Sequence, residues 1–147
     1  MKFTRILGPA LVVAALMGAM ATPATAQDGT YFGEDIGNGT YNPLTAWPNA
    51  LAARTQFLSY LVGVGTENFE SFSHNQNGPL ALSFPGAGTA TLTGNGYIYD
   101  VPTGTTSSGG RYATSGTKYW TAASSFGIDF ANPVAAFGFY GTDVGDY

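Results

Sequence analysis

The amino-acid sequence predicts an all-β protein, an antiparallel sandwich of jelly-roll or concanavalin-like type with one helix near its N-terminus. Apolar and polar side chains alternate from residue 67 onward, and turns rich in Gly, Pro and Asn separate the short apolar runs. These runs recur about every 8–12 residues, a spacing typical of sandwiches and barrels. The chain has 147 residues, which is enough for one domain, so the strands are expected to share a single core.

Residues 1–26 have the three-part pattern of a secretory signal peptide. Lys2 and Arg5 precede an apolar run at residues 6–21, and small residues, Ala-Thr-Ala, follow at positions 24–26. The run has about 16 residues, fewer than the roughly 20 that span a bilayer as a helix. Because no second run of that length follows, the sequence predicts a secreted or cell-surface protein with no membrane span in the mature chain.

Residues 27–48 are predicted to form an irregular arm, since they are rich in Gly, Asn, Asp and Thr and show no periodicity. The domain is predicted to span residues 49–147 and to begin with a helix over residues 49–62. Apolar side chains recur in that segment at helical spacing, and its alanines favour a helix. Gly63 is expected to end it.

About seven short strands are predicted after the helix from the alternating pattern. They lie at residues 67–72, 80–84, 90–92, 97–101, 119–120, 126–130 and 134–140. Turn residues separate them at 77–79, 85–86, 94–96 and 132–133, and residues 102–116 form a long loop of Gly, Ser and Thr. The predicted core consists of Leu58, Leu61, Phe69, Leu80, Leu82, Phe84, Leu92, Ile98, Phe126, Ile128, Phe130, Phe137 and Phe139.

The last apolar run, residues 134–140, lies close to the final residue, Tyr147. A flat apolar strand at an exposed edge promotes aggregation. We therefore expect this strand to lie within a sheet and the sequence to be a truncated piece of a longer protein.

Two segments of the domain carry a resemblance to a known family. The first contains Asn49, Arg54 and the sequence Asn-Phe-Glu-Ser-Phe at residues 68–72, and the second is AFGFYGTDVGD at residues 136–146. Together they resemble the PEP-CTERM-type exported bacterial β-sandwich proteins over about residues 49–147. The resemblance implies a secreted bacterial protein with a lectin-like sandwich and no established catalytic role. Family members continue past the second segment with more strands and a C-terminal sorting tag, which is absent from this sequence.

The composition and the motifs of the sequence argue against several classes of function. The chain has no Cys, which excludes a thiolate metal site and a Cys nucleophile. Removal of the leader would leave three basic and nine acidic side chains, a net charge of −6, which argues against nucleic acid as a partner. The one histidine, His74, lies in a polar loop, and no Gly-x-Ser-x-Gly motif is present. The sequence therefore predicts no catalytic residue.

Four carboxylates are candidate calcium ligands. Asp143 and Asp146 flank a glycine that permits tight backbone curvature, and Glu67 and Glu70 begin the first predicted strand. Calcium takes six to eight oxygen ligands, and extracellular sites for it can be weak. The alternative interpretation is that these acids only solvate loop tips.

Aromatic side chains are the other candidate binding groups. Tyr97 lies on the same face of its predicted strand as Tyr99, and Tyr119 and Trp120 follow the long loop. Sugar-binding sandwiches stack the apolar face of a sugar ring on such side chains. Tyr97, Tyr119 and Trp120 are therefore the predicted glycan-stacking residues. Because side chains alternate along a strand, one member of each adjacent aromatic pair is expected to point into the core.

These observations favour a non-enzymatic secreted or cell-surface protein that binds or organises extracellular polysaccharide. One alternative is a carbohydrate-active enzyme of the glycoside hydrolase type, which would use two of the acids as a carboxylate pair. Another is a purely structural matrix component that associates with itself and binds no ligand.

Overall fold

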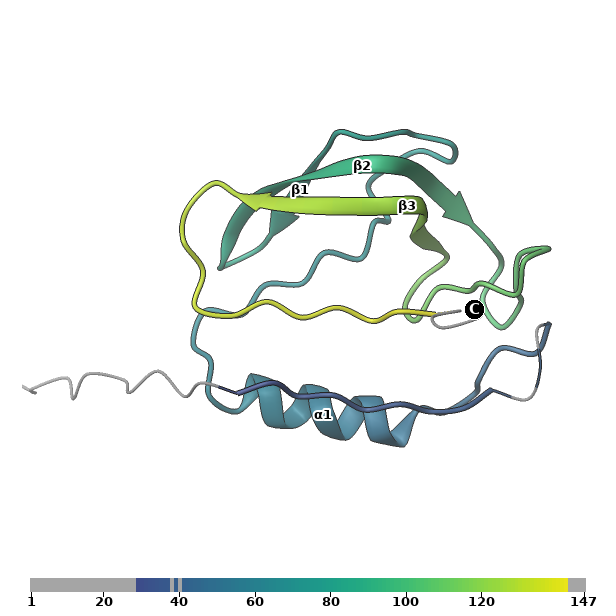
Figure 1. Ribbon diagram of the computed structural model, residues 1–147, viewed down its shortest axis with the longest axis horizontal. Coiled ribbons are helices and arrows are strands. Elements are labelled where there is room, and N and C mark those ends of the chain that lie inside the picture. The colour runs from purple at the N-terminus through teal and green to yellow at the C-terminus, as the bar shows by residue number, and fades with distance from the viewer. Residues whose placement is uncertain (1–28, 38, 40, 143–147) are drawn as a thin grey trace, which may run out of the picture.

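The computed structural model describes residues 29–37, 39 and 41–142, and within them the fold is mainly β. A helix, α1 (Pro48–Leu58), is followed by three strands, β1 (Leu80–Phe84), β2 (Gly88–Asp100) and β3 (Lys118–Phe130). The strands form one antiparallel sheet in the order β1-β2-β3. Figure 1 shows the sheet on one side of the molecule and α1 on the other, with the segment that follows β3 between them. The second sheet that a sandwich requires is not among the described residues.

The strands β2 and β3 are longer than the sequence pattern predicts. The glycines around Asn95 suggest a turn that would split β2 in two, but this prediction is wrong. The strand instead continues past a β-bulge, in which Gly94 faces Phe126 and Gly96 faces Ala122, so that the extra residues lie on β3. Gly94 has φ +121°, a conformation that a residue without Cβ adopts readily. Residues 119–120 and 126–130 thus belong to one continuous strand, which is bulged at its middle.

One face of the sheet carries the hydrophobic core. Even-numbered positions of β2 point toward it, and Ile98 is completely buried. Part of its cover comes from the chain before β1, because Asn75 N donates to Ile98 O (2.8 Å) and Ile98 N donates to Gln76 O (2.9 Å). The buried cluster comprises Leu80, Leu82, Ala90, Leu92 and Ile98, with Phe69, Phe72, Phe84, Trp120, Ile128 and Phe130 packed around it.

Most of the predicted core is confirmed, but five of its members lie outside the buried cluster. Leu58 and Leu61 are half-buried, and α1 buries none of its residues. The other three, Phe126, Phe137 and Phe139, are exposed, and Phe139 retains 73% of its accessible surface. The described residues contain no second sheet to cover these rings, although Phe57 of α1 lies beside Gly138 of the same segment.

Two predicted strands are absent from the described structure. Residues 67–72 form a tight turn, in which Phe69 adopts φ +64° and its N–H donates to the carboxylate of Glu67. Residues 134–140 are irregular and exposed. Their aromatic side chains still pack on the sheet, since the ring of Phe137 contacts that of Phe130 at 5.4 Å between centroids. The alternating apolar side chains of this segment pack on the core face of the sheet. A strand also needs hydrogen bonds to a neighbouring backbone, which alternation alone does not provide.

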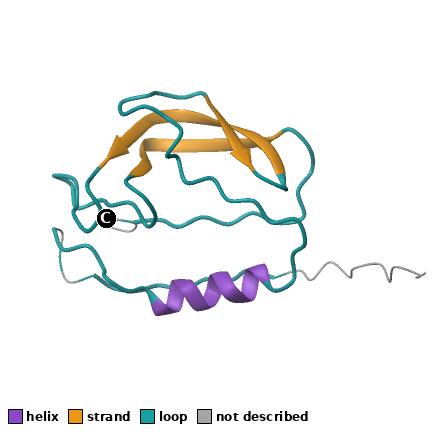
Figure 2. Ribbon diagram, turned by 180° about the vertical axis from the view of Figure 1, so that it is seen from behind, coloured by secondary structure: helices purple, strands orange, loops and turns teal. Residues whose placement is uncertain are grey.

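The helix ends four residues before its predicted limit. It begins with Pro48 at its first turn, and the N–H of Ser59 bonds to Thr55 O and Gln56 O beyond its last residue. Figure 2 shows the helix as a surface element, separated from the strands by irregular chain. No described helix is long and apolar enough to cross a membrane.

A distant carboxylate caps this helix. Trp47 at the N-cap position offers no side-chain hydrogen bond, and the first turn of α1 contains no acidic residue. Asp35, from the segment that precedes α1, instead accepts hydrogen bonds from Asn49 N (3.1 Å) and Ala50 N (2.9 Å). A negative charge here satisfies N–H groups that have no partner within the helix and interacts favourably with the helix dipole.

Replacement of this capping side chain is expected to destabilise the fold. Asp35→Ala should lower the free energy of unfolding by about 1 kcal/mol, the usual effect of losing an N-cap carboxylate. Glu34→Ala is the matched control, because Glu34 contributes its main-chain oxygen to Asn49 Nδ2. Denaturant unfolding followed by circular dichroism measures both. Equal stabilities of the two variants would contradict the capping role.

Candidate functional site

The face of the sheet opposite the core carries a group of tyrosines. Tyr97 and Tyr99 come from β2, and the register places them directly across from Thr121 and Tyr119 of β3. Because side chains on paired positions of an antiparallel sheet project to the same side, all four lie together. Tyr99 is central, with ring centroids 6.2 Å from Tyr97 and 5.8 Å from Tyr119.

A tight turn in the loop between β2 and β3 lies over these side chains. Ser107 N donates to Arg111 O (2.8 Å), and Gly110 N donates to Ser107 O (3.0 Å), which closes the turn. The Ser107 hydroxyl also accepts from Gly109 N (3.3 Å) and Arg111 N (3.2 Å). Local hydrogen bonds of this kind fix the shape of a Ser/Gly turn.

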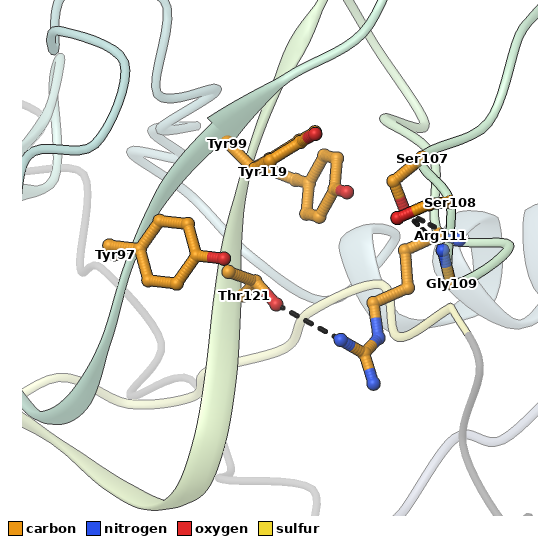
Figure 3. A pocket seen from close by; sticks show the side chains of 8 residues that line it. All are labelled: Tyr97, Tyr99, Ser107, Ser108, Gly109, Arg111, Tyr119 and Thr121. Atoms are coloured by element: carbon orange, nitrogen blue, oxygen red, sulfur yellow. Dashed lines mark hydrogen bonds between the residues drawn. The ribbon is translucent and has the colours of Figure 1, made fainter.

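The turn and the two strands line a hollow of about 170 Å³ that is open to solvent. Its lining consists of Tyr97, Tyr99, Ser107, Ser108, Gly109, Arg111, Tyr119 and Thr121. Figure 3 shows the tyrosines on the strand side and the turn residues opposite them. The guanidinium of Arg111 crosses between the two sides and donates from Nη1 to Thr121 Oγ1 (3.3 Å). An aromatic wall with a few converging polar groups is one feature of small-molecule sites, and this hollow is smaller than most of them.

The environment favours the neutral form of one hydroxyl group of the hollow, that of Tyr119. Burial raises the pKa of Tyr119, and a hydrogen bond with Ser107 opposes this shift in part. A neutral phenol both donates and accepts a hydrogen bond. Tyr99 also contacts His74, whose ring packs edge-on against it with 5.0 Å between ring centroids. The His74 side chain is itself positioned by Asp100, because its Nδ1 lies 2.9 Å from Asp100 Oδ1.

The structure brings two of the three predicted glycan-stacking residues together and separates the third from them. Tyr97 and Tyr119 line the hollow, whereas Trp120 packs on the core side of the sheet. A Cβ at Gly96 would lie 2.4 Å from the Trp120 ring, so that ring depends on the glycine beneath it. Strand alternation already indicates that Tyr119 and Trp120 point to opposite faces. Nothing local in the sequence identifies Arg111 and Ser107, because the fold of the loop places them.

Glu67, the first predicted calcium ligand, holds two parts of the backbone together. Its Oε1 accepts from Phe69 N (2.7 Å), and its Oε2 accepts from Ser83 N of β1 (3.1 Å). Both carboxylate oxygens therefore have backbone donors, and the side chain joins the turn before β1 to the edge of the sheet.

Glu70 has a similar role at the start of β3. Its carboxylate accepts from Thr117 N and Lys118 N, both at 2.8 Å, and from the Thr117 hydroxyl. The hydrogen bond from Thr117 N is the main cause that lowers the pKa of Glu70. Lys118 Nζ completes the link by donating to Glu70 O (3.0 Å). This cluster fixes the point at which the long loop returns to the sheet.

The calcium site stays a prediction. Asp143 and Asp146 lie outside the described residues, so their distance from the two glutamates is not defined. Within residues 29–37, 39 and 41–142, no group of three or more His, Cys, Asp or Glu side chains is arranged to hold a metal ion. The carboxylates of Glu67 and Glu70 each already accept two or more hydrogen bonds. A metal ion would have to compete with these hydrogen bonds for the carboxylate oxygens.

Comparisons with known proteins identify no relative. No protein-family model, curated protein or solved structure matches the chain. The resemblance to PEP-CTERM-type proteins accordingly stays a prediction from the sequence.

Loss of the Glu70 charge is expected to weaken the fold in a pH-dependent way. Glu70→Gln should lower the free energy of unfolding at neutral pH by about 1–3 kcal/mol, the range for hydrogen bonds to a charged group. Because the folded pKa lies below the unfolded value of about 4.3, this stabilisation is present above that pH and is lost as pH falls through the folded pKa. Wild type should therefore lose melting temperature more steeply than Glu70→Gln on acidification below about pH 5.

The control for this experiment is Asp129→Asn, which neutralises an exposed carboxylate on β3. It should retain the pH dependence of the wild type. Parallel melting curves for wild type and Glu70→Gln across the acidic range would contradict the assigned role.

Proposed function

We propose that this protein is a non-enzymatic secreted or cell-surface protein that binds extracellular polysaccharide through the hollow between β2, β3 and the turn at residues 107–111. The single observation that carries the proposal is the cluster of three tyrosine rings on one wall of that hollow, faced by hydroxyl and guanidinium groups on the other. The predicted signal peptide at residues 1–26 supports secretion and lies outside the described residues.

The chemistry of the lining suits a sugar. A pyranose has apolar C–H faces, which pack on aromatic rings, and a rim of hydroxyl groups, which need hydrogen-bond partners once water is displaced. Tyr97 and Tyr99 supply ring surface, and the Tyr119 hydroxyl, the Ser108 hydroxyl and Arg111 supply donors and acceptors. A hydrocarbon ligand would leave these polar groups unpaired, at a cost in free energy.

The same lining favours binding over hydrolysis. Glycoside hydrolysis requires two carboxyl groups on either side of the scissile bond. The eight residues of the hollow include no Asp or Glu, and Glu70 uses its carboxylate on backbone N–H groups. The glycoside hydrolase alternative therefore has no support from this site.

We also infer that the sheet belongs to a jelly-roll or concanavalin-like sandwich, with a second layer over the core face. The support is the apolar surface that this face leaves exposed at Phe126, Phe137 and Phe139. Monomeric soluble proteins rarely leave a contiguous apolar surface of large size uncovered, so such rings mark a place for further packing.

Hydrogen exchange tests the sandwich. If residues 134–140 pair within a second sheet, their amide hydrogens should exchange about a hundredfold or more slowly than those of an unstructured peptide, because a paired N–H exchanges only when the sheet opens. The amides of β2, which is the central strand, serve as the protected reference. Exchange of residues 134–140 at the unstructured rate would contradict the second sheet.

Glycan binding is tested by a variant of the central tyrosine. The full-length chain is screened on a glycan array, with and without calcium, and the best ligand is titrated. Tyr99→Ala should weaken its binding by about tenfold or more, since an aromatic contact contributes about 1–1.5 kcal/mol and 1.4 kcal/mol is a factor of ten. Tyr41→Ala is the matched control, because Tyr41 is exposed and remote in sequence from the hollow.

Two results would overturn the binding proposal. One is the absence of any glycan ligand on the array. The other is equal affinity of Tyr99→Ala and Tyr41→Ala when both variants melt at the wild-type temperature.

A further inference from the structure

The shape of the hollow carries an inference about which part of a polysaccharide it receives. We propose that the hollow binds one terminal sugar unit at the end of a glycan chain and does not bind along the interior of the chain. The inference rests on the proposed function and specifies its ligand. Three features of the hollow support it: its size, the inclination of its rings and the hydrogen bond between Arg111 and Thr121.

The first feature is the volume. The hollow holds about 170 Å³, whereas sites for drug-sized ligands begin at about 300 Å³. One pyranose ring with its hydroxyl groups is a ligand of that scale, so the hollow itself receives a single unit, and a linked unit would lie outside it.

The second feature is the inclination of the aromatic rings. A surface that follows a polysaccharide presents its rings in one plane, so that successive sugars stack along it. Here the planes of Tyr97 and Tyr99 are inclined by 62°, and those of Tyr99 and Tyr119 by 45°. Rings at these angles do not form a flat strip on which successive sugars could stack.

The third feature is a barrier at the side of the hollow. The bond from Arg111 Nη1 to Thr121 Oγ1 joins the turn to β3, and Figure 3 shows it crossing from one side of the hollow to the other. Thr121 is nearly buried, which fixes the acceptor in place. A chain that continued through the hollow in this direction would have to break the bond, whereas a terminal unit that enters from solvent leaves it intact.

The test compares affinities along a series of chain lengths. The full-length chain is titrated calorimetrically with the methyl glycoside, the disaccharide and the hexasaccharide of glucose, mannose and N-acetylglucosamine. If the site binds a terminal unit, the three ligands of a sugar that binds should have dissociation constants, expressed per glycan chain, that agree within about threefold. One protein should bind each hexasaccharide. A site that accepts any unit along the chain would instead raise the hexasaccharide affinity about sixfold over the methyl glycoside, because six positions would bind.

The outcomes separate the inference from the proposed function. A gain beyond threefold from methyl glycoside to hexasaccharide, or more than one protein per chain, overturns the terminal-unit inference and leaves glycan binding intact. Failure of every series, together with a silent glycan array, overturns both.

A substitution at the barrier provides a second readout. Thr121→Val removes the acceptor for Arg111 and retains the shape of the side chain, so the hexasaccharide should now bind more than threefold more tightly than the methyl glycoside. Thr93→Val is the matched control, since Thr93 lies on the same face of the sheet and its hydroxyl bonds to Gly127 O outside the hollow. If Thr121→Val leaves affinity independent of chain length, the bond is not the barrier.

Discussion

The antiparallel pairing of β2 with β3 is the constraint on which the rest of the structure depends. It aligns two strands of thirteen residues and gives each a core face and an outer face. On one face the pairing gathers Leu92, Ile98 and their neighbours into the core, and on the other it gathers the three tyrosines. Because side chains alternate with a period of two, the same register that buries Ile98 places Tyr97 and Tyr99 on the opposite face, where they are half-buried. Core and candidate site are therefore two consequences of one set of backbone hydrogen bonds.

Three carboxylates among the described residues fix irregular backbone. Asp35 caps α1, Glu67 joins a turn to β1, and Glu70 holds the end of the long loop against β3. Each accepts N–H groups that no regular element satisfies, and unpaired backbone donors are costly wherever water is excluded. The arrangement also explains how a loop rich in Gly and Ser can present a defined turn at residues 107–111. Glu70 fixes the return of the loop to the sheet, and Ser107 closes its tip.

Sequence reasoning succeeds here where the information is local and periodic. Alternation at Leu80, Leu82, Leu92 and Ile98 identifies the buried positions, and Pro48 marks the start of the helix to within one residue. The same reasoning fails at the glycines on either side of Asn95, since a turn and a β-bulge use the same residues. It fails again at residues 134–140, because alternating apolar side chains indicate a surface to be packed and do not provide a neighbouring strand.

In the candidate site, too, the sequence pattern predicts some placements and leaves others to the tertiary structure. Pattern alone places Tyr97 and Tyr99 on one strand face and assigns Tyr119 and Trp120 to opposite faces, since the pleat of a strand is a local property. Only the tertiary structure decides that Trp120 is the member facing the core, that Arg111 and Ser107 stand over the tyrosines, and that Glu70 anchors their loop. These placements join residues 10 to 48 positions apart, through hydrogen bonds whose partners are chosen by the closing of a flexible loop. No local preference of the chain encodes that choice, because it depends on which distant groups remain unpaired once the sheet has formed.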